Sequence, residues 1–138
     1  MFALNIVTPD KKLVADVEME EVFVPAHSGE LNILPGHSPL VSTLHEGVLK
    51  YRLKGESSLS AVAISWGYVE VTPNGVNILA ETAETKEEID IERAKKALTD
   101  VEQLLEGADV TPEDILNYHA KRRRAEARIS VSEGTTLH

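Results

Sequence analysis

Residues 29–49, GELNILPGHSPLVSTLHEGVL, hold two turn signals between short apolar runs. One is Pro35-Gly36 and the other is Ser38-Pro39. Proline fixes its own φ and glycine permits a positive φ, so these pairs specify a tight corner between strands. The stretch carries little catalytic chemistry. It therefore predicts a corner of a β domain in the first part of the chain.

Strand patterns extend over residues 1–82, on both sides of this corner. Apolar residues alternate or cluster in runs at residues 2–7, 17–24, 48–53, 59–71 and 76–80. Between two of these runs, Pro73-Asn74-Gly75 is a strong hairpin signal. About seven or more short strands with closely spaced turns are typical of a β-sandwich. Gly67, inside the run 59–71, predicts a bulge or a close packing point.

The pattern becomes helical at about residue 86. Apolar residues there follow steps of three or four: Ile91, Ala94, Leu98, Val101 and Leu105. This spacing predicts a helix with one apolar face, ending near Gly107. Thr111-Pro112 predicts the start of a second helix, with Thr111 as its N-cap, and this helix is expected to run to about Ser130. The short connection predicts an antiparallel helical hairpin.

The predicted fold class is α+β, with an N-terminal antiparallel β-sandwich over residues 1–85 and a C-terminal antiparallel two-helix hairpin over residues 86–138. The tail Ser132–His138 is expected to be disordered. The second helix has few large apolar side chains, and burying one contributes about 1.5–3 kcal/mol. Because ordering each residue costs about 1–2 kcal/mol of backbone entropy, we expect the hairpin to leave the sandwich at a small cost in free energy.

Composition narrows the classes of function. The 138-residue chain has 42% hydrophobic residues, no cysteine and a net charge of −9, so nucleic-acid binding is not expected. Its first ten residues show no secretory signal, and no apolar run approaches the ~18 residues that span a bilayer. A soluble protein is expected, with any membrane association through a partner. The five histidines lack the spacing of a metal site, and no phosphate-binding loop or nucleophile motif is recognisable.

Charged side chains on the two predicted helices could form a binding site. Asp90 and Arg93 lie three positions apart, on the same side of the first helix. Asp90 also suits an N-cap, and by spacing alone capping is the favoured interpretation. On the second helix, Arg124 and Arg128 project together and could hold phosphate oxygens. Asp90 could then accept a hydrogen bond from an adenine amino group or a ribose hydroxyl, and Ala94 leaves room for a flat base.

The corner closely resembles that of the epsilon subunits of bacterial F-type ATP synthases, where a GELGI-PGHAPL-type run precedes a strand that begins with glycine. The matching residues are Gly29-Glu30-Leu31, Ile33, Pro35-Gly36-His37, Pro39-Leu40 and Gly47. The resemblance covers nearly the whole chain, with the sandwich to about residue 84 and the hairpin to about residue 131. It implies a non-catalytic subunit of the central stalk of a proton- or sodium-translocating ATP synthase. Such a rotor subunit couples rotation of the c-subunit ring to the catalytic head.

The resemblance also implies a nucleotide site. Epsilon subunits that bind ATP have an Ile/Leu-Asp-x-x-Arg-Ala motif at the start of the first C-terminal helix, arginines on the second helix and an acid nearby. The matching residues are Ile89, Asp90, Arg93, Ala94, Arg124, Arg128 and Glu84. Arg122 and Arg123 are adjacent alternatives on the second helix. ATP would be a regulatory ligand that favours the compact hairpin, and no cofactor is required.

The partners follow from the same resemblance. The sandwich would bind the gamma subunit, and Glu30 and His37 would face the polar loops of the c ring. Residues 113–128 hold five basic and three acidic side chains. Extended along gamma, the hairpin would carry this basic helix to the acidic beta subunits of the alpha/beta head and block rotation in the hydrolytic direction. The protein would lie at the cytoplasmic face of the plasma membrane, as a peripheral part of the complex.

Other interpretations stay open on the sequence alone. Glu30 could be an exposed turn acid, and the basic helix a solvated helix end. The chain could be a coupling subunit or scaffold with neither nucleotide binding nor an inhibitory role. A free β-sandwich enzyme or carbohydrate-binding module is a further class. It would need a polar or aromatic-lined cleft, and Trp66 and three tyrosines provide few side chains for one. Co-purification with a rotor complex and calorimetry with ATP would separate these classes.

Overall fold

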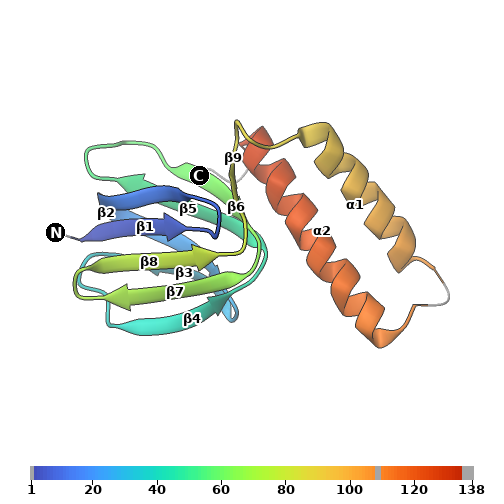
Figure 1. The fold of residues 1–138 in the computed structure, drawn as a ribbon, viewed down its shortest axis with the longest axis horizontal. Helices are drawn as coiled ribbons and strands as arrows, with labels where there is room; N and C mark the ends of the chain where they lie inside the picture. Colours follow the sequence, from blue (N-terminus) through green and yellow to red (C-terminus); the bar gives the residue numbers. More distant parts are fainter. Residues whose placement is uncertain (1, 108–109, 135–138) are drawn as a thin grey trace.

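The computed structural model describes residues 2–107 and 110–134. It has two parts, a β-sandwich and a pair of helices beside one end of it (Figure 1). The strands are β1 (Ala3–Val7), β2 (Lys12–Ala26), β3 (Gly29–Ile33), β4 (Leu40–Leu44), β5 (Gly47–Leu53), β6 (Ser60–Ile64), β7 (Gly67–Thr72), β8 (Gly75–Ala80) and β9 (Ala83–Thr85). The helices are α1 (Ile91–Leu105) and α2 (Pro112–Glu133). The predicted order, a sandwich followed by a helical hairpin, is confirmed.

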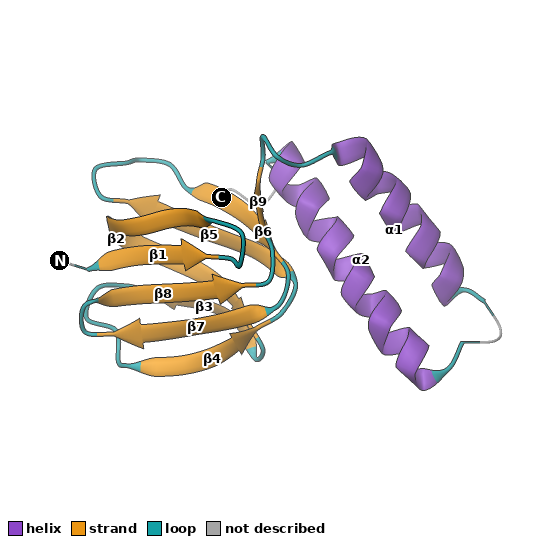
Figure 2. Ribbon diagram, in the orientation of Figure 1, coloured by secondary structure: helices purple, strands orange, loops and turns teal. Residues whose placement is uncertain are grey.

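The strands pair in the order β1-β8-β7-β4-β2-β5-β6-β9, and β3 also pairs with β2. In Figure 2, β1, β8, β7 and β4 form a front layer, with β2, β3 and β5 behind it. The 15-residue β2 bonds to strands of both layers, which lets one long strand join them. The pairings are antiparallel except for β1 with β8, which run parallel. The sandwich is thus antiparallel at all but one of the described pairings.

The core lies between the layers and is built from aliphatic side chains. Its largest fully buried members are Leu4, Ile6, Ile33, Leu49, Ile64 and Ile78. In β7 and β8, buried and exposed residues alternate, as expected for strands with one face toward the core. Burial of about 1.5–3 kcal/mol per large aliphatic side chain makes this core the main source of sandwich stability.

The predicted hairpin at Pro73-Asn74-Gly75 forms. Thr72 pairs with Gly75 across the two-residue turn, and Gly75 takes a φ of 153°. Gly67 begins β7 opposite Ala80, and a Cβ there would lie 2.0 Å from the Leu79 carbonyl oxygen. Gly67 is therefore a close packing point, one of the two roles that its place in the sequence indicated.

The predicted strand over residues 59–71 is wrong as a single strand. It divides into β6 and β7 at Ser65-Trp66, where the chain passes from one layer to the other. Ser65 anchors the passage, because its backbone N donates to the Thr82 carbonyl and its hydroxyl accepts from the Thr82 N at 2.9 Å. The apolar pattern hides the break, since the residues on both sides of it belong to buried strands.

Both helices begin at the predicted caps. Asp90 accepts from the Arg93 backbone N, and Thr111 accepts from the Asp114 backbone N, each at 3.1 Å. The second helix, however, ends later than Ser130. It continues through Glu133 and stops at Gly134, which has a left-handed φ of 71°. The expectation of disorder is wrong at Ser132 and Glu133, and residues 135–138 of the expected tail lie outside the described residues.

Tertiary packing explains the longer helix. Val131 is 1% exposed and packs with Ala127 of α2 and Ala63 of β6. Partly buried Val48, Ala61 and Ile89 surround this small cluster. The final turn of α2 is therefore held by the sandwich, and α1 packs against α2. Because the docking cluster is made mostly of alanine and valine, its apolar area is modest.

Candidate functional site

A cleft of about 200 Å³ lies where β9, the linker of residues 86–90, α1 and α2 meet. Its lining residues are Glu84, Glu88, Asp90, Arg93, Ala94 and Arg128. Five of these were predicted from the sequence as nucleotide-site residues. The fold therefore brings together groups that lie up to 44 positions apart in the chain, as for Glu84 and Arg128.

Arg128 and Glu84 form the strongest contact of the cleft. The Arg128 Nε donates to Glu84 Oε1 at 2.6 Å, and both side chains are about a quarter exposed. A hydrogen bond between two ionised groups at this distance is charge-assisted and about twice as strong as a neutral one. Since a guanidinium has five N–H donors, this bond leaves Arg128 able to bind an anion as well.

Asp90 and Arg93 lie at the start of α1, on the other side of the cleft. Asp90 caps the helix through its side chain, so the capping interpretation describes its role in this structure. Both side chains lie at the surface, and the buried Ala94 lines the cleft between them and α2. Because Asp90 already bonds an N–H group at this end of α1, the groups of the cleft that could contact an anion are Arg93 and Arg128.

Two of the predicted residues lie elsewhere. Ile89 packs against the cluster that docks α2 on the sandwich. Arg124 lines a second cleft of about 280 Å³, together with Glu46, Trp66, Asn117, Ala120 and Lys121. Of the alternatives next to it, Arg122 pairs with Glu126 along α2 at 3.0 Å, and Arg123 pairs with Glu46 of the sandwich. In this structure Arg128 is thus the arginine of α2 that lines the first cleft.

Glu88 is a member of the cleft that the sequence reasoning missed. Its carboxylate accepts from Lys11 Nζ at 2.6 Å and from the backbone N and hydroxyl of Thr85 at 3.1 and 3.0 Å. The bonds from Lys11 and Thr85 lower the pKa of Glu88 to about 2. The Thr-x-x-Glu spacing is that of a capping box and could have indicated the local part of this arrangement.

The low pKa has a consequence for the linker. Because the folded state holds the pKa of Glu88 below its usual value, its stabilising contribution is present above about pH 4.5 and is lost as the pH falls toward 2. Lys11 therefore stays tied to Glu88 throughout the neutral range. This contact fastens the linker to the connection between β1 and β2.

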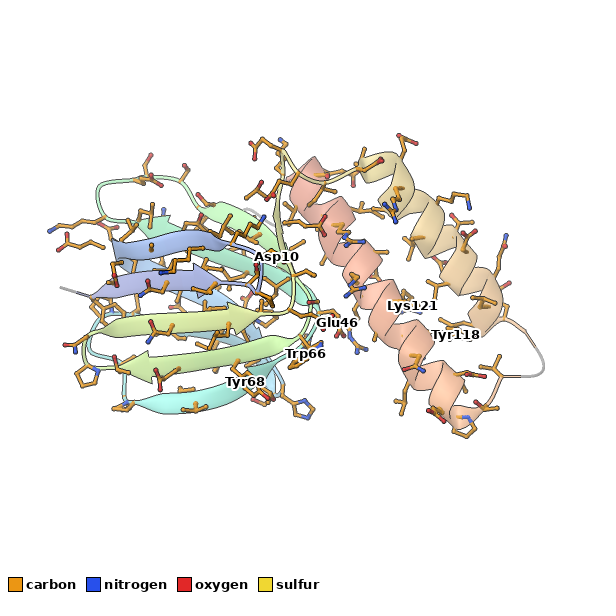
Figure 3. All side chains as sticks on the ribbon, viewed as in Figure 1. Asp10, Glu46, Trp66, Tyr68, Tyr118 and Lys121 are labelled. Carbon is orange, nitrogen blue, oxygen red and sulfur yellow. The ribbon has the colours of Figure 1, made fainter. Side chains whose placement is uncertain are left out.

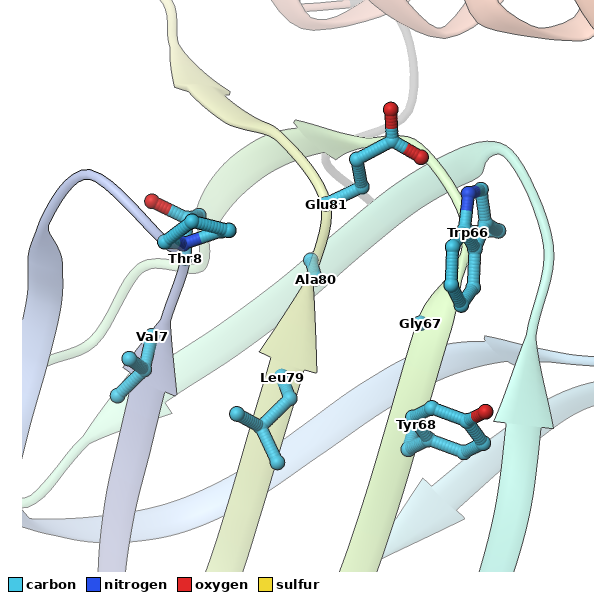
Figure 4. Close-up of a pocket in the computed structure, with 9 residues that line it drawn as sticks. Val7, Thr8, Trp66, Gly67, Tyr68, Leu79, Ala80 and Glu81 are labelled. Atoms are coloured by element: carbon cyan, nitrogen blue, oxygen red, sulfur yellow. The ribbon is translucent and has the colours of Figure 1, made fainter.

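A broad apolar surface on the front layer was also missed. It borders an open hollow of about 430 Å³ and consists of Val7, Pro9, Trp66, Tyr68 and Leu79, which we call the apolar sheet face. Figure 4 shows Trp66, Tyr68 and Leu79 standing out from neighbouring strands. Their exposed fractions are 51%, 48% and 55%, although side chains of this kind are usually buried. Exposed apolar side chains grouped in this way are typical of a surface that contacts another molecule.

Comparison with known proteins identifies the family. Residues 1–86 match the family described as the ATP synthase delta/epsilon chain, beta-sandwich domain. The ATP synthase epsilon chain of Bdellovibrio bacteriovorus is 45% identical, over 94% of this chain and 93% of that protein. The chain belongs to the ATP synthase epsilon chain family. The epsilon chain of Bacillus licheniformis is 46% identical, over 94% of this chain and 95% of its own length.

Solved structures share the fold of this family member. A chain of the mitochondrial ATP synthase of Euglena gracilis, from an OSCP/F1/c-ring structure, superposes with a TM-score of 0.71 at 24% identity, covering 97% of this chain and 78% of its own. A chain from the central stalk/c-ring of the Tetrahymena thermophila enzyme superposes with a TM-score of 0.58 at 16% identity, covering 98% of this chain and 96% of its own.

Neither α1 nor α2, as far as the structure describes them, is long and apolar enough to cross a membrane.

The corner residues that carried the family resemblance form the expected turn. The His37 backbone N donates to the Leu34 carbonyl, and Gly36 takes a φ of 87°. Glu30, at the start of β3, is half exposed and pairs with Lys50 at 3.3 Å. Lys50 also lies over the Phe23 ring, 5.2 Å from its centroid. Glu30 is thus held in place by a cation of its own sandwich, while His37 bonds through Nδ1 to the Ser38 carbonyl.

Proposed function

We propose that this family member is a central-stalk subunit whose sandwich binds the gamma subunit and the c ring, and which does not itself catalyse ATP synthesis. The match over nearly the whole length of epsilon chains carries this proposal. The subunit would transmit ring rotation to the alpha/beta head. It would be peripheral, held at the cytoplasmic face of the plasma membrane by its partners.

The apolar sheet face supplies a surface for gamma. Tyr68 lies opposite Leu79, and Leu79 lies opposite Val7, so the apolar side chains form one row across three strands. Aromatic side chains at the centre of such a surface often carry most of the binding energy. Glu30 lies at the start of β3 and His37 in the turn after its end, and both would face the polar loops of the c ring. A carboxylate held by Lys50 presents a fixed geometry to a basic loop.

Binding to gamma can be tested with one substitution on this face. We expect Tyr68→Glu to weaken assembly with gamma about 30-fold or more, because it places a charge at an aromatic anchor. The matched control is Leu34→Glu, because Leu34 is as exposed as Tyr68, at 48%, but lies in the corner after β3 and not on the sheet face. Affinity is measured with purified gamma and the full chain. Wild-type binding by Tyr68→Glu would remove the sheet face from the gamma interface.

The first cleft supports a regulatory nucleotide. Arg93 and Arg128 would contact the phosphates of ATP, and Asp90 would accept from the adenine amino group or a ribose hydroxyl. ATP would bind groups from α1, α2 and β9 at once, and these lie together only in the docked hairpin. A ligand shifts a population only through its differential affinity, so ATP would favour the docked state. The undocked hairpin would carry basic α2 to the acidic beta subunits and inhibit hydrolysis.

Hydrogen exchange checks whether the hairpin is loosely held. Few large apolar side chains dock α2, so we expect the amides of α2 to exchange at least ten times faster than those of β7 and β8, on the order of 1.4 kcal/mol less protected. Millimolar ATP should slow exchange in α2 and leave β7 and β8 unchanged. Equal protection in helix and core would contradict a mobile hairpin. Unchanged exchange with ATP would favour the coupling subunit without nucleotide binding or inhibition.

A further inference from the structure

Glu46 is an acidic residue of the sandwich that faces basic residues of α2. It lies between β4 and β5, and Figure 3 shows it at the sandwich rim toward α2, with Trp66 and Lys121 nearby. Arg123 donates to the same Glu46 oxygen from Nη2 at 3.0 Å and from Nε at 3.3 Å. Lys121 and Arg124 line the cleft that Glu46 borders. Arg123 thus pairs with Glu46, and two further cations of α2 line the same cleft.

Burial shows that this contact belongs to the docked hairpin. The Glu46 side chain is 13% exposed, whereas that of Arg123 is 47% exposed. Glu46 is thus partly shielded from water in the docked state, where Arg123 supplies a cation for its carboxylate. When α2 leaves the sandwich, Glu46 regains water and needs no cation. The interaction therefore stabilises the docked state specifically.

The neighbouring arginine shows that position on the helix decides the contact. Arg122 pairs with Glu126 of the same helix, a contact that does not require docking. Arg123, one residue later, crosses to Glu46. The chain therefore contains two adjacent arginines, one that joins the helix to the sandwich and one that does not.

We propose that Glu46 is a latch that holds the basic run Lys121–Arg124 against the sandwich and keeps it from an acidic partner surface. The inference rests on the proposed mobility of the hairpin. It is separate from the nucleotide cleft, because Glu46 is not among the residues that line that cleft. Among the described residues, two ion pairs join α2 to the sandwich in addition to the apolar cluster around Val131. Glu84–Arg128 lines the nucleotide cleft, and Glu46–Arg123 does not.

A distance measurement on the full chain tests the latch. Because the chain has no cysteine, Asn74→Cys and Glu113→Cys allow one fluorophore pair to report the distance between the sandwich and the tip of the hairpin. We expect Glu46→Gln and Arg123→Gln each to raise the ratio of open to docked molecules about threefold to tenfold at low salt. Arg122→Gln, the matched control, should leave the ratio within about twofold.

Salt separates a latch from a general effect on folding. Since salt screens an ion pair, added salt should open the wild type and change Glu46→Gln much less. Equal opening by Arg123→Gln and Arg122→Gln would overturn the latch.

ATP distinguishes failure of the latch from failure of the proposed function. If ATP shifts the wild type toward the docked state, but Glu46→Gln docks as well as the wild type without ATP, the latch alone is overturned. No opening in any variant, at any salt concentration, would overturn both the latch and the mobile hairpin.

Discussion

Arg128→Gln should lower the affinity for ATP about 10- to 100-fold, the loss expected when a hydrogen bond to a charged group is removed. Arg128 is the helix 2 arginine that lines the cleft with Asp90 and Arg93. Its guanidinium can contact phosphate oxygens in a way that a neutral amide cannot. Calorimetric titration of the full chain at fixed salt measures the change. Sandwich stability should be nearly unaffected, because Arg128 is partly exposed and belongs to the hairpin.

Arg122→Gln is the matched control, because Arg122 pairs within α2 and carries the same charge. It should bind ATP within about twofold of the wild type, as expected for the loss of an exposed intrahelical pair. Wild-type affinity in Arg128→Gln would exclude this cleft as the phosphate site. Arg124→Gln gives a separate result, since Arg124 lines the second cleft. A loss as large as that of Arg128→Gln would show that Arg124 leaves this cleft when ATP binds.

The fold was predictable where the signals are local. Pro73-Asn74-Gly75 and Thr111-Pro112 specify a turn and a helix start through their own backbone chemistry. The break at Ser65 was missed, because buried strands lie on both sides of it and Gly67 also fits a bulge within a single strand. The true end of α2 depends on Val131, which is buried against a strand distant in sequence. Burial of Val131 keeps this last turn helical, and Gly134 ends the helix.

The residues of the candidate site also fall into two groups: those brought together by local spacing and those brought together only by the fold. Asp90, Arg93 and Ala94 lie within one helical turn, so their proximity follows from helix geometry alone. Arg124 and Arg128 are equivalent by spacing, and only the way α2 crosses the sandwich places Arg128 beside Glu84. The contact of Lys11 with Glu88 joins residues 77 positions apart and has no counterpart in any sequence pattern. The apolar sheet face likewise depends on strand order, which brings β1, β8 and β7 together.

Gly67→Ala should lower the free energy of unfolding of the sandwich by about 3 kcal/mol or more, at the upper end for overpacking. The added Cβ would lie 2.0 Å from the Leu79 carbonyl oxygen and 2.9 Å from the Ala80 Cα. These are backbone atoms of the paired strand, so no side chain can rotate to make room. The strands β7 and β8 must separate, which weakens their hydrogen bonds and moves Tyr68 relative to Leu79. The slowest-exchanging amides of the sandwich report the loss.

Gly36→Ala separates this steric effect from the general cost of replacing glycine. Gly36 has a φ of 87°, and a Cβ there would meet no atom within 4 Å. Its substitution should cost only the backbone strain of a positive φ, about 1–2 kcal/mol. If Gly67→Ala costs no more than Gly36→Ala, the two strands can yield at this point and close contact is not required. A much larger cost at Gly67 would mean that strand contact, rather than chain flexibility, requires glycine beneath the apolar sheet face. Gamma binding by Gly67→Ala would then fall together with stability, because the same strand pair positions Tyr68 and Leu79.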